Sequence, residues 1–301
     1  MRHARAAGVV LAVLVTACAE RHASSPLFPV PTVTAEPGDA GADADAPQAA
    51  PGCRVRAGRT GALAQQVTVL GKPRRYLLVV PPSYSPGAPY PVVYVLHGHG
   101  GSGAQARAAF DLEAVANGRA IFVYPDAPGG WDLDSPAGRN ADVALFDASL
   151  ALTQSAYCVD LERVFVTGFS NGAYMANQLA CRRGNRVRAV VSHGGGGPYE
   201  TAGGYDASGH LVCPYKPVAS LVIHGLADGT VAPSEGQKSE DHFAHANGCA
   251  KSPSPTSPSP CLAYSGCANP VRSCRIPGLR HALWPEGRKL TFDFFAEQMA
   301  R

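Results

Sequence analysis

The sequence is poor in charged residues: only 16% of its 301 residues are Asp, Glu, Lys or Arg, and the formal net charge is +3. The basic residues are spread thinly, so no basic stripe is present of the kind that follows a nucleic-acid backbone. The sequence also lacks a CxxC pair and an HExxH motif, which argues against a zinc site. We therefore expect no nucleic-acid partner, no metal and no cofactor.

A long apolar run is also lacking, because the N-terminal run over 8–15 is far too short to span a bilayer. Arg2, His3 and Arg5 precede it, and this pattern predicts an export signal over 1–17. The run ends in "LVTAC", which resembles the bacterial lipobox and makes Cys18 the expected lipidation site. The alternative is an ordinary signal peptide cut near the same place. We expect an exported protein that is secreted or held at a membrane by this lipid alone.

Residues 18–52 are rich in Pro, Ala, Gly and Asp and have few large apolar side chains. Such a segment cannot bury enough surface to offset the entropy of ordering, so it is expected to be the lipid anchor followed by a disordered tether. The remaining residues, 53–301, are long and apolar enough for one catalytic domain. They contain an even number of cysteines, which in an exported chain favours disulfides over free thiols.

Eight short β-branched runs indicate strands, and five stretches between the later runs indicate helices. The expected strands are 65–70, 75–80, 92–97, 121–124, 163–168, 187–193, 219–224 and 271–276, and the expected helices are about 104–117, 140–156, 171–183, 235–247 and 289–300. From the third strand onward, strands and helices alternate. This order predicts an α/β fold with a mostly parallel eight-stranded sheet, helices on both faces and an antiparallel start. About 25 residues between the strands at 187–193 and 219–224 leave no room for a large cap domain.

The sequence Gly168-Phe169-Ser170-Asn171-Gly172 is a GxSxG motif between an expected strand and an expected helix. A strand, tight turn and helix in this order form a nucleophile elbow, in which the serine Oγ projects from the sheet. The two glycines are required where strand and helix backbones approach too closely for a Cβ. The alternative is a serine that only caps a helix. The context favours Ser170 as a nucleophile.

A serine hydroxyl needs a base and a group that orients the base. His281 lies in a Gly- and Pro-flanked loop after the last expected strand, at the sheet rim where ligands bind in parallel sheets. Asp228 follows the preceding strand at the same rim. His97, His193 and His224 sit at strand ends, where packed histidines are usual. We therefore predict Ser170, Asp228 and His281 as the catalytic triad.

The developing oxyanion needs two hydrogen-bond donors. We assign them to the backbone N–H groups of Asn171, at the helix start, and of His99, in the glycine-rich loop 97–103. Several aromatic residues are candidates to line the cleft, with the alternative that they only cover the edge of the core. The expected substrate-binding residues are Trp131, Tyr199 and Trp284, with Tyr205 as a further candidate.

The helix after Ser170 runs back along the sheet. Its far end should therefore bring Cys181 near Cys158, which precedes the strand over 163–168. We expect a Cys158–Cys181 disulfide and leave the other pairings open.

These residues resemble secreted esterases of the polyhydroxybutyrate depolymerase and feruloyl esterase type, close to carbohydrate esterase family one. The resemblance extends from about residue 76 to the C-terminus, over "YVLHGHGGS", "YPDAPGGWD", "CVDLERVFVTGFSNGAYMANQLAC", "HGLADGTVAP", "NGC" and "HALWP". It implies the α/β-hydrolase fold and ester hydrolysis through an acyl-serine. The same triad follows from the resemblance, and the order Ser, Asp, His is that of α/β-hydrolases.

The sequence leaves alternatives open. Feruloyl, acetyl-xylan and hydroxybutyrate esters all remain as substrates, in a polymeric or smaller form. A different class would be a catalytically silent surface lipoprotein that binds polysaccharide. A serine peptidase on the same fold is less consistent with the absence of room for a propeller or cap.

Overall fold

The computed structural model describes residues 50–54, 58–201 and 204–300. The expected export signal, Cys18 and all of the expected tether except residues 50–52 lie outside the described residues. A membrane-spanning helix, which needs about 20 apolar residues, is absent from the part of the chain that the structure describes.

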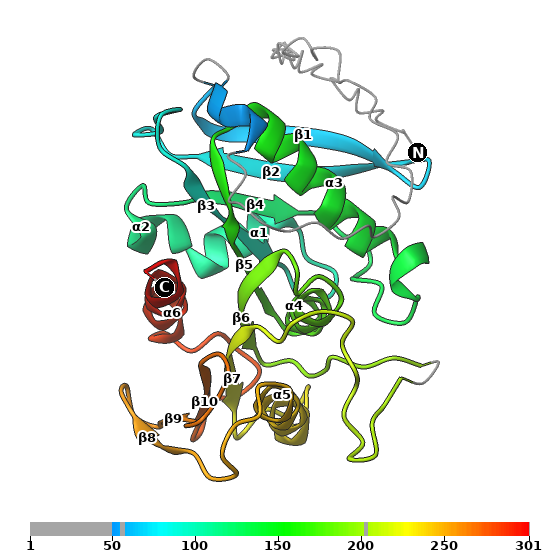
Figure 1. Cartoon of the computed structure of the whole chain (residues 1–301), viewed down its shortest axis with the longest axis vertical. Helices are drawn as coiled ribbons and strands as arrows, with labels where there is room; N and C mark the ends of the chain where they lie inside the picture. Colours follow the sequence, from blue (N-terminus) through cyan, green and yellow to red (C-terminus); the bar gives the residue numbers. More distant parts are fainter. Residues whose placement is uncertain (1–49, 55–57, 202–203, 301) are drawn as a thin grey trace, which may run out of the picture. The chain divides into compact units, whose positions relative to one another are not determined.

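The described residues form one open sheet with the strand order β1-β2-β4-β3-β5-β6-β7-β10-β9-β8 (Figure 1). β1 pairs antiparallel with β2, and β2 pairs antiparallel with β4. The pairs from β4 through β3, β5, β6 and β7 to β10 are all parallel. The strands are β1 Gly61–Val69, β2 Lys72–Val80, β3 Tyr90–Leu96, β4 Ile121–Pro125, β5 Val159–Phe169, β6 Val187–His193, β7 Ala219–Gly225, β8 Ser254–Thr256, β9 Cys261–Ala263 and β10 Val271–Ile276.

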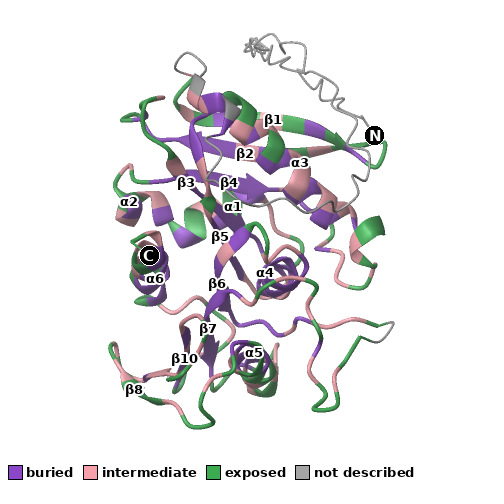
Figure 2. Ribbon diagram, viewed as in Figure 1, coloured by how far each residue is buried: buried purple, intermediate pink, exposed green. Residues whose placement is uncertain are grey.

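Helices cover both faces of the sheet, and each face has its own apolar cluster. α3, α4 and α5 pack on one face, while α1, α2 and α6 pack on the other, and the central strands between them are buried (Figures 1 and 2). Strands buried on both faces explain the nearly continuous β-branched runs in the sequence. The helices are α1 Gly103–Phe110, α2 Leu112–Ala116, α3 Ala141–Ala156, α4 Asn171–Arg182, α5 Pro233–Ala246 and α6 Gly287–Met299, with two 3-10 helices at Pro51–Arg54 and Ala137–Arg139.

The architecture expected from the sequence is confirmed, with two differences. The sheet has ten strands rather than eight, because two short strands that follow α5, β8 and β9, pair with each other and add to the edge at β10. The helix expected over 104–117 is two helices, because Asp111 adopts a left-handed conformation with φ of 46° between α1 and α2. No helix lies between β6 and β7 within residues 194–201 and 204–218, in agreement with the prediction of no large cap.

The expected Cys158–Cys181 disulfide is wrong. Cys158 is bonded to Cys53, and Cys181 is bonded to Cys213. α4 does return Cys181 to the end of the sheet where β5 begins, but two other segments bring cysteines to the same end. The 3-10 helix Pro51–Arg54 packs on α3 there, and the chain entering β7 carries Cys213. The two remaining disulfides are Cys249–Cys267 and Cys261–Cys274.

Candidate active site

The turn from β5 into α4 holds Ser170 in a strained conformation, with φ of 56° and ψ of −122°. A non-glycine residue seldom adopts a positive φ, and such strain clusters at functional sites. The turn is possible because its flanking glycines allow close backbone contacts. A Cβ on Gly168 would lie 2.2 Å from the Gly172 carbonyl oxygen, and a Cβ on Gly172 would lie 2.4 Å from the His97 carbonyl oxygen. The sharp turn therefore places the Ser170 side chain above the rim of the sheet.

Three side chains from separate loops meet at this rim. Ser170 Oγ lies 2.9 Å from His281 Nε2, and His281 Nδ1 lies 2.7 Å from Asp228 Oδ2. In the arrangement required for a base, the serine hydroxyl donates to Nε2 and Nδ1–H donates to the carboxylate. The structure thus brings together the three residues that the sequence predicts as a triad. The geometry is that of a serine whose proton can pass to an imidazole held by an acid.

Asp228 is buried and its carboxylate is held by several donors. Oδ1 accepts hydrogen bonds from the backbone N–H groups of Thr230 and Val231, both at 2.9 Å, while Oδ2 accepts from His281. Burial by itself raises the pKa of this carboxyl, but the hydrogen bonds from His281 and the two backbone groups outweigh it. The net effect lowers the pKa of Asp228, so the group stays ionised where an imidazolium would need its charge.

The three strand-end histidines are buried and hydrogen-bonded, as expected for packed residues. His97 Nε2 accepts from the Ala127 N–H at 3.0 Å, and His224 Nε2 donates to the Val231 carbonyl oxygen at 3.1 Å. His193 Nε2 lies 2.9 Å from Thr291 Oγ1, and burial lowers the pKa of His193 to about 3. A histidine with so low a pKa is a weak base at neutral pH, which leaves His281 as the base beside Ser170.

The two backbone donors predicted for the oxyanion lie at the start of α4 and in the loop after β3. Asn171 is the first residue of α4, and its backbone N–H has no hydrogen bond to any other described residue. The same is true of the His99 N–H. Gly98, which precedes His99, is close enough to the elbow that a Cβ on it would lie 3.6 Å from Ser170 Cβ. The two N–H groups therefore lie in segments next to Ser170 and have no partner in the described part of the chain, as the predicted role in the oxyanion hole requires.

Trp131 does not have the expected role in substrate binding, because only 6% of the residue is exposed. Its indole Nε1–H donates to the His97 carbonyl oxygen at 2.7 Å, and its ring packs on the His97 ring. Its backbone N–H donates to Asn171 Oδ1 at 2.7 Å. Trp131 thus supports the loop that carries His99 and the start of α4, rather than offering a face to a ligand.

Tyr199 and Trp284 are half-buried, and they lie in two separate surface hollows. Tyr199 and the exposed Tyr205 line a hollow of about 380 Å³, which the segment 194–197 connects to the elbow. Trp284 lines another of about 340 Å³ together with Phe110 and Leu283. Both residues are partly exposed, so both remain candidates for contact with a substrate.

The sequence did not single out two further contacts of His281. The Phe169 ring packs against the His281 ring with centroids 4.7 Å apart. Gly194 has a positive φ of 58°, and a Cβ on it would lie 3.6 Å from both Asp228 Oδ2 and His281 Nδ1. Phe169 occupies the variable position just before the serine in GxSxG, which gives no sign of its contact with His281. Gly194 follows β6 in the "SHGGGG" run, and this glycine run at the rim of the sheet was a sequence signal of a close approach there.

Asp228→Asn is expected to lower kcat by about 10³- to 10⁴-fold while the protein stays folded. The asparagine oxygen would accept from Thr230 and Val231, which turns its amide N–H₂ toward His281. The amide favours the tautomer with the proton on Nε2, which cannot accept a proton from Ser170. Hydrolysis of p-nitrophenyl acetate and the thermal midpoint Tm measure the two effects. Asp293→Asn, at an exposed ion pair on α6, is the matched control, and more than a tenth of normal activity in Asp228→Asn would contradict the assignment.

Comparison with known proteins places this chain in a family. No protein-family model matches the chain. The chain is 35% identical to a probable feruloyl esterase C from Aspergillus niger over 66% of its length and 69% of the relative's. It is 34% identical to feruloyl esterase C from Emericella nidulans, over 66% of this chain and 73% of the relative. A third relative, feruloyl esterase D from Neurospora crassa, is 34% identical over 67% of this chain and 70% of the relative.

Solved structures share the fold. An acetyl xylan esterase from Aspergillus awamori superimposes with a TM-score of 0.63 at 18% identity, over 78% of this chain and 99% of that one. A ferulic acid esterase from Anaeromyces mucronatus gives a TM-score of 0.51 at 17% identity, over 81% and 93%. All of these relatives are named as esterases, so neither a silent binding protein nor a peptidase is favoured. The chain has the α/β-hydrolase fold, is a serine carboxylic ester hydrolase and belongs to the feruloyl esterase family.

Proposed function

We propose that Ser170, His281 and Asp228 carry out ester hydrolysis in two steps. Ser170 Oγ attacks the ester carbonyl carbon while His281 Nε2 takes the hydroxyl proton, and the leaving alcohol then receives that proton as the C–O bond breaks. Water attacks the acyl-serine with His281 again as base, which releases the acid and restores Ser170. The geometry that supports this is the pair of contacts at 2.9 Å and 2.7 Å.

The backbone N–H groups of Asn171 and His99 stabilise the oxyanion in both steps. They lie at a helix start and in a glycine-rich loop, where fixed donors are aimed at developing charge without reorganisation. Trp131 holds the two elements in register through its bonds to Asn171 Oδ1 and the His97 carbonyl oxygen. Asp228 stabilises the imidazolium that forms on His281.

The substrate that we propose is a feruloyl ester carried on a plant polysaccharide. The observation that carries this proposal is the identity of 34–35% to relatives named feruloyl esterase over about two thirds of the chain. The site is consistent with a bulky ester, because Ser170 and His281 are only half-buried and no cap covers them within the described residues. Aromatic side chains in two surface hollows, Tyr199 and Tyr205 in one and Trp284 in the other, offer faces for a phenolic ring.

A panel of four esters separates the substrate classes. We expect kcat/KM for methyl ferulate to exceed that for p-nitrophenyl acetate and for hydroxybutyrate oligomers by at least about tenfold, since one well-filled apolar subsite contributes about 1–3 kcal/mol. Release of ferulate is followed by absorbance, and acetate release from acetylated xylan by an enzymatic assay. A protein that releases acetate from xylan but no ferulate would overturn the substrate proposal while leaving the esterase mechanism intact.

We also propose that the chain is exported, with a lipid on Cys18 as its membrane anchor. The basic start, the short apolar run and the "LVTAC" sequence support this, although these residues lie outside the described ones. The four disulfides of the described domain are consistent with an oxidising compartment.

A further inference from the structure

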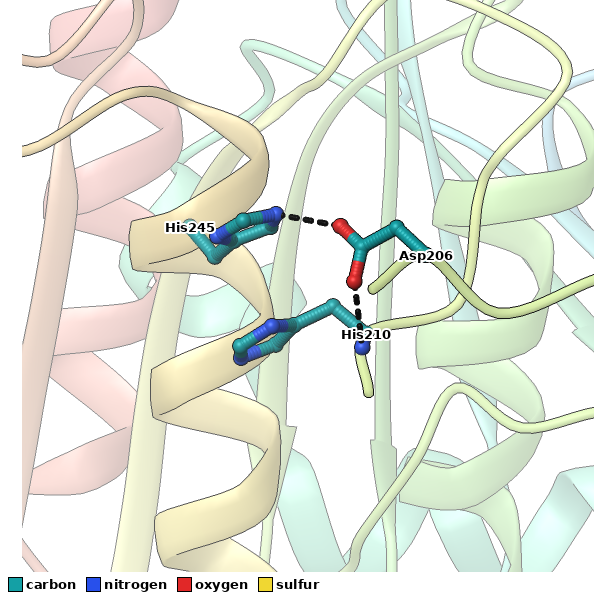
Figure 3. Close-up of side chains that lie close together, drawn as sticks. All are labelled: Asp206, His210 and His245. Carbon is teal, nitrogen blue, oxygen red and sulfur yellow. Dashed lines mark hydrogen bonds and ion pairs between the residues drawn. The ribbon is translucent and has the colours of Figure 1, made fainter. Parts of the chain in front are cut away.

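Two histidines and an aspartate converge on the surface between α5 and the segment that precedes β7. Asp206 and His210 belong to this segment, and His245 lies in the last turn of α5 (Figure 3). One ligand atom from each of the three lies within 4.8 Å of the other two. Asp206 and His245 are 39 positions apart in the sequence, so the cluster forms only in the folded chain.

The contacts within the cluster leave at least one side-chain nitrogen without a partner in the part of the chain that the structure describes. His245 Nε2 lies 2.7 Å from Asp206 Oδ2. The His210 and His245 rings stack with centroids 4.0 Å apart and an interplanar angle of 8°. His210 Nδ1 is buried and has no hydrogen-bond partner among the described residues. A buried polar nitrogen without a partner is costly, and here it sits beside a carboxylate and a second imidazole.

The turn that carries Asp206 and His210 is fixed by its own backbone. Asp206 N–H donates to the His210 carbonyl oxygen at 2.9 Å, and Asp206 Oδ1 accepts from the His210 N–H at 3.0 Å. Tyr205 and Leu211 form a β-bridge at the base of the turn. The Cys181–Cys213 disulfide then ties the segment to the end of α4. Two of the ligands thus lie on a braced turn and the third on a long helix, so the backbone that carries them is fixed and only side chains need to adjust.

An ion pair between Asp206 and His245 does not by itself account for this arrangement. The two side chains are 31% and 42% exposed, and pairs so accessible to water contribute little to stability. The pair also leaves His210 unexplained, since its ring stacks on His245 without a polar partner. Two imidazoles and one carboxylate are, however, a recurrent ligand set for divalent transition metals, among them Zn²⁺.

We propose that Asp206, His210 and His245 form a zinc site that ties the turn at 205–211 to α5. In tetrahedral coordination with bonds of about 2.0–2.1 Å, ligand atoms lie about 3.3 Å apart. Asp206 and His245 would separate by roughly half an ångström, and the His210 ring would turn out of its stack. The fourth position faces solvent, where water can complete the coordination. The ligands are neither cysteines nor part of HExxH, which is why the sequence motifs gave no sign of them.

The position of the site suggests what it does. His210 lines the same hollow of about 380 Å³ as Tyr199 and Tyr205, while the triad residues do not line it. A metal at the far wall would hold the turn and fix that wall without touching Ser170 or His281. The site is therefore structural, with an effect on the shape of the hollow rather than on the chemical step.

Titration of ZnCl₂ into the purified chain, first stripped with EDTA and then freed of it, tests the proposal by calorimetry. We expect one Zn²⁺ per chain with a Kd of about 10 μM or lower. Asp206→Asn, His210→Ala and His245→Ala should each weaken binding by at least about tenfold. Zn²⁺ at 100 times its Kd should raise Tm by about 5–10 °C in the unsubstituted protein and by much less in His245→Ala. Because the His245 side chain is 42% exposed, its loss should leave the fold intact.

Two controls separate this site from other zinc ligands. His281→Ala removes the triad histidine and should bind Zn²⁺ as the unsubstituted protein does. Asp293→Asn removes an exposed carboxylate on α6, far along the chain from the cluster, and should also leave binding unchanged. A Kd weaker than about 1 mM, unchanged binding in all three cluster variants, or loss of binding in His281→Ala would overturn the proposal.

Discussion

Ser170→Ala is expected to reduce kcat for p-nitrophenyl acetate by about 10⁴-fold or more, with the protein folded and Tm within a few degrees of normal. The variant removes the only atom that forms the acyl bond, while His281 and Asp228 keep their 2.7 Å contact. A fluorophosphonate that labels serine hydrolases should modify the unsubstituted protein at Ser170, as seen by peptide mass. It should leave the variant unmodified.

Ser155→Ala is the matched control, because Ser155 is an exposed serine on α3 whose hydroxyl only donates to a backbone carbonyl of its own helix. It should keep full activity. If Ser170→Ala retained activity near the normal level, or if the label were found at another serine, the nucleophile would have to be sought elsewhere. The family membership, which rests on sequence identity, would be unaffected.

Much of this site could be derived from the sequence because its parts follow a local rule. A strand ending in Gly168, a tight turn at Ser170 and a helix beginning at Asn171 are all readable from neighbouring residues. The parallel topology then fixes which rim receives the loops after later strands, so Asp228 and His281 could be placed at that rim before their contact was known. The topology of the sheet therefore limits where Asp228 and His281 can lie more strongly than the identity of the residues around them does.

Features that depend on tertiary packing could not be derived in this way. The sequence correctly predicted that Cys158 and Cys181 lie at the same end of the sheet. Which cysteines pair at that end, however, depends on the positions of Cys53 and Cys213. Trp131 is conspicuous in "APGGWD", yet nothing local indicates that its indole N–H would bond to His97 rather than face a ligand. His245 of the proposed zinc site is similarly distant in sequence from Asp206, by 39 positions.

Gly172→Ala is expected to destabilise the fold by at least about 3 kcal/mol, an amount typical of severe overpacking. A Cβ at this position would lie 2.4 Å from the His97 carbonyl oxygen and 2.5 Å from that of Leu96. These are backbone atoms at the end of β3, so no side chain can rotate to relieve the overlap. α4 would have to move away from the central strands, and the elbow would move with it. Tm should fall by about 6–12 °C, and the esterase activity should fall as Ser170 leaves His281.

Gly138→Ala distinguishes this overlap from a general cost of replacing glycine. Gly138 lies in the 3-10 helix Ala137–Arg139, and a Cβ there has no neighbour within 4 Å. Its substitution should leave Tm within about 1–2 °C of normal, since the added methyl meets no atom and the unfolded chain loses entropy. Both variants are scanned at one heating rate with the disulfides intact. A Gly172→Ala protein with normal Tm would mean that α4 can slide along β3, and the close packing that holds the serine turn would then not be what fixes its conformation.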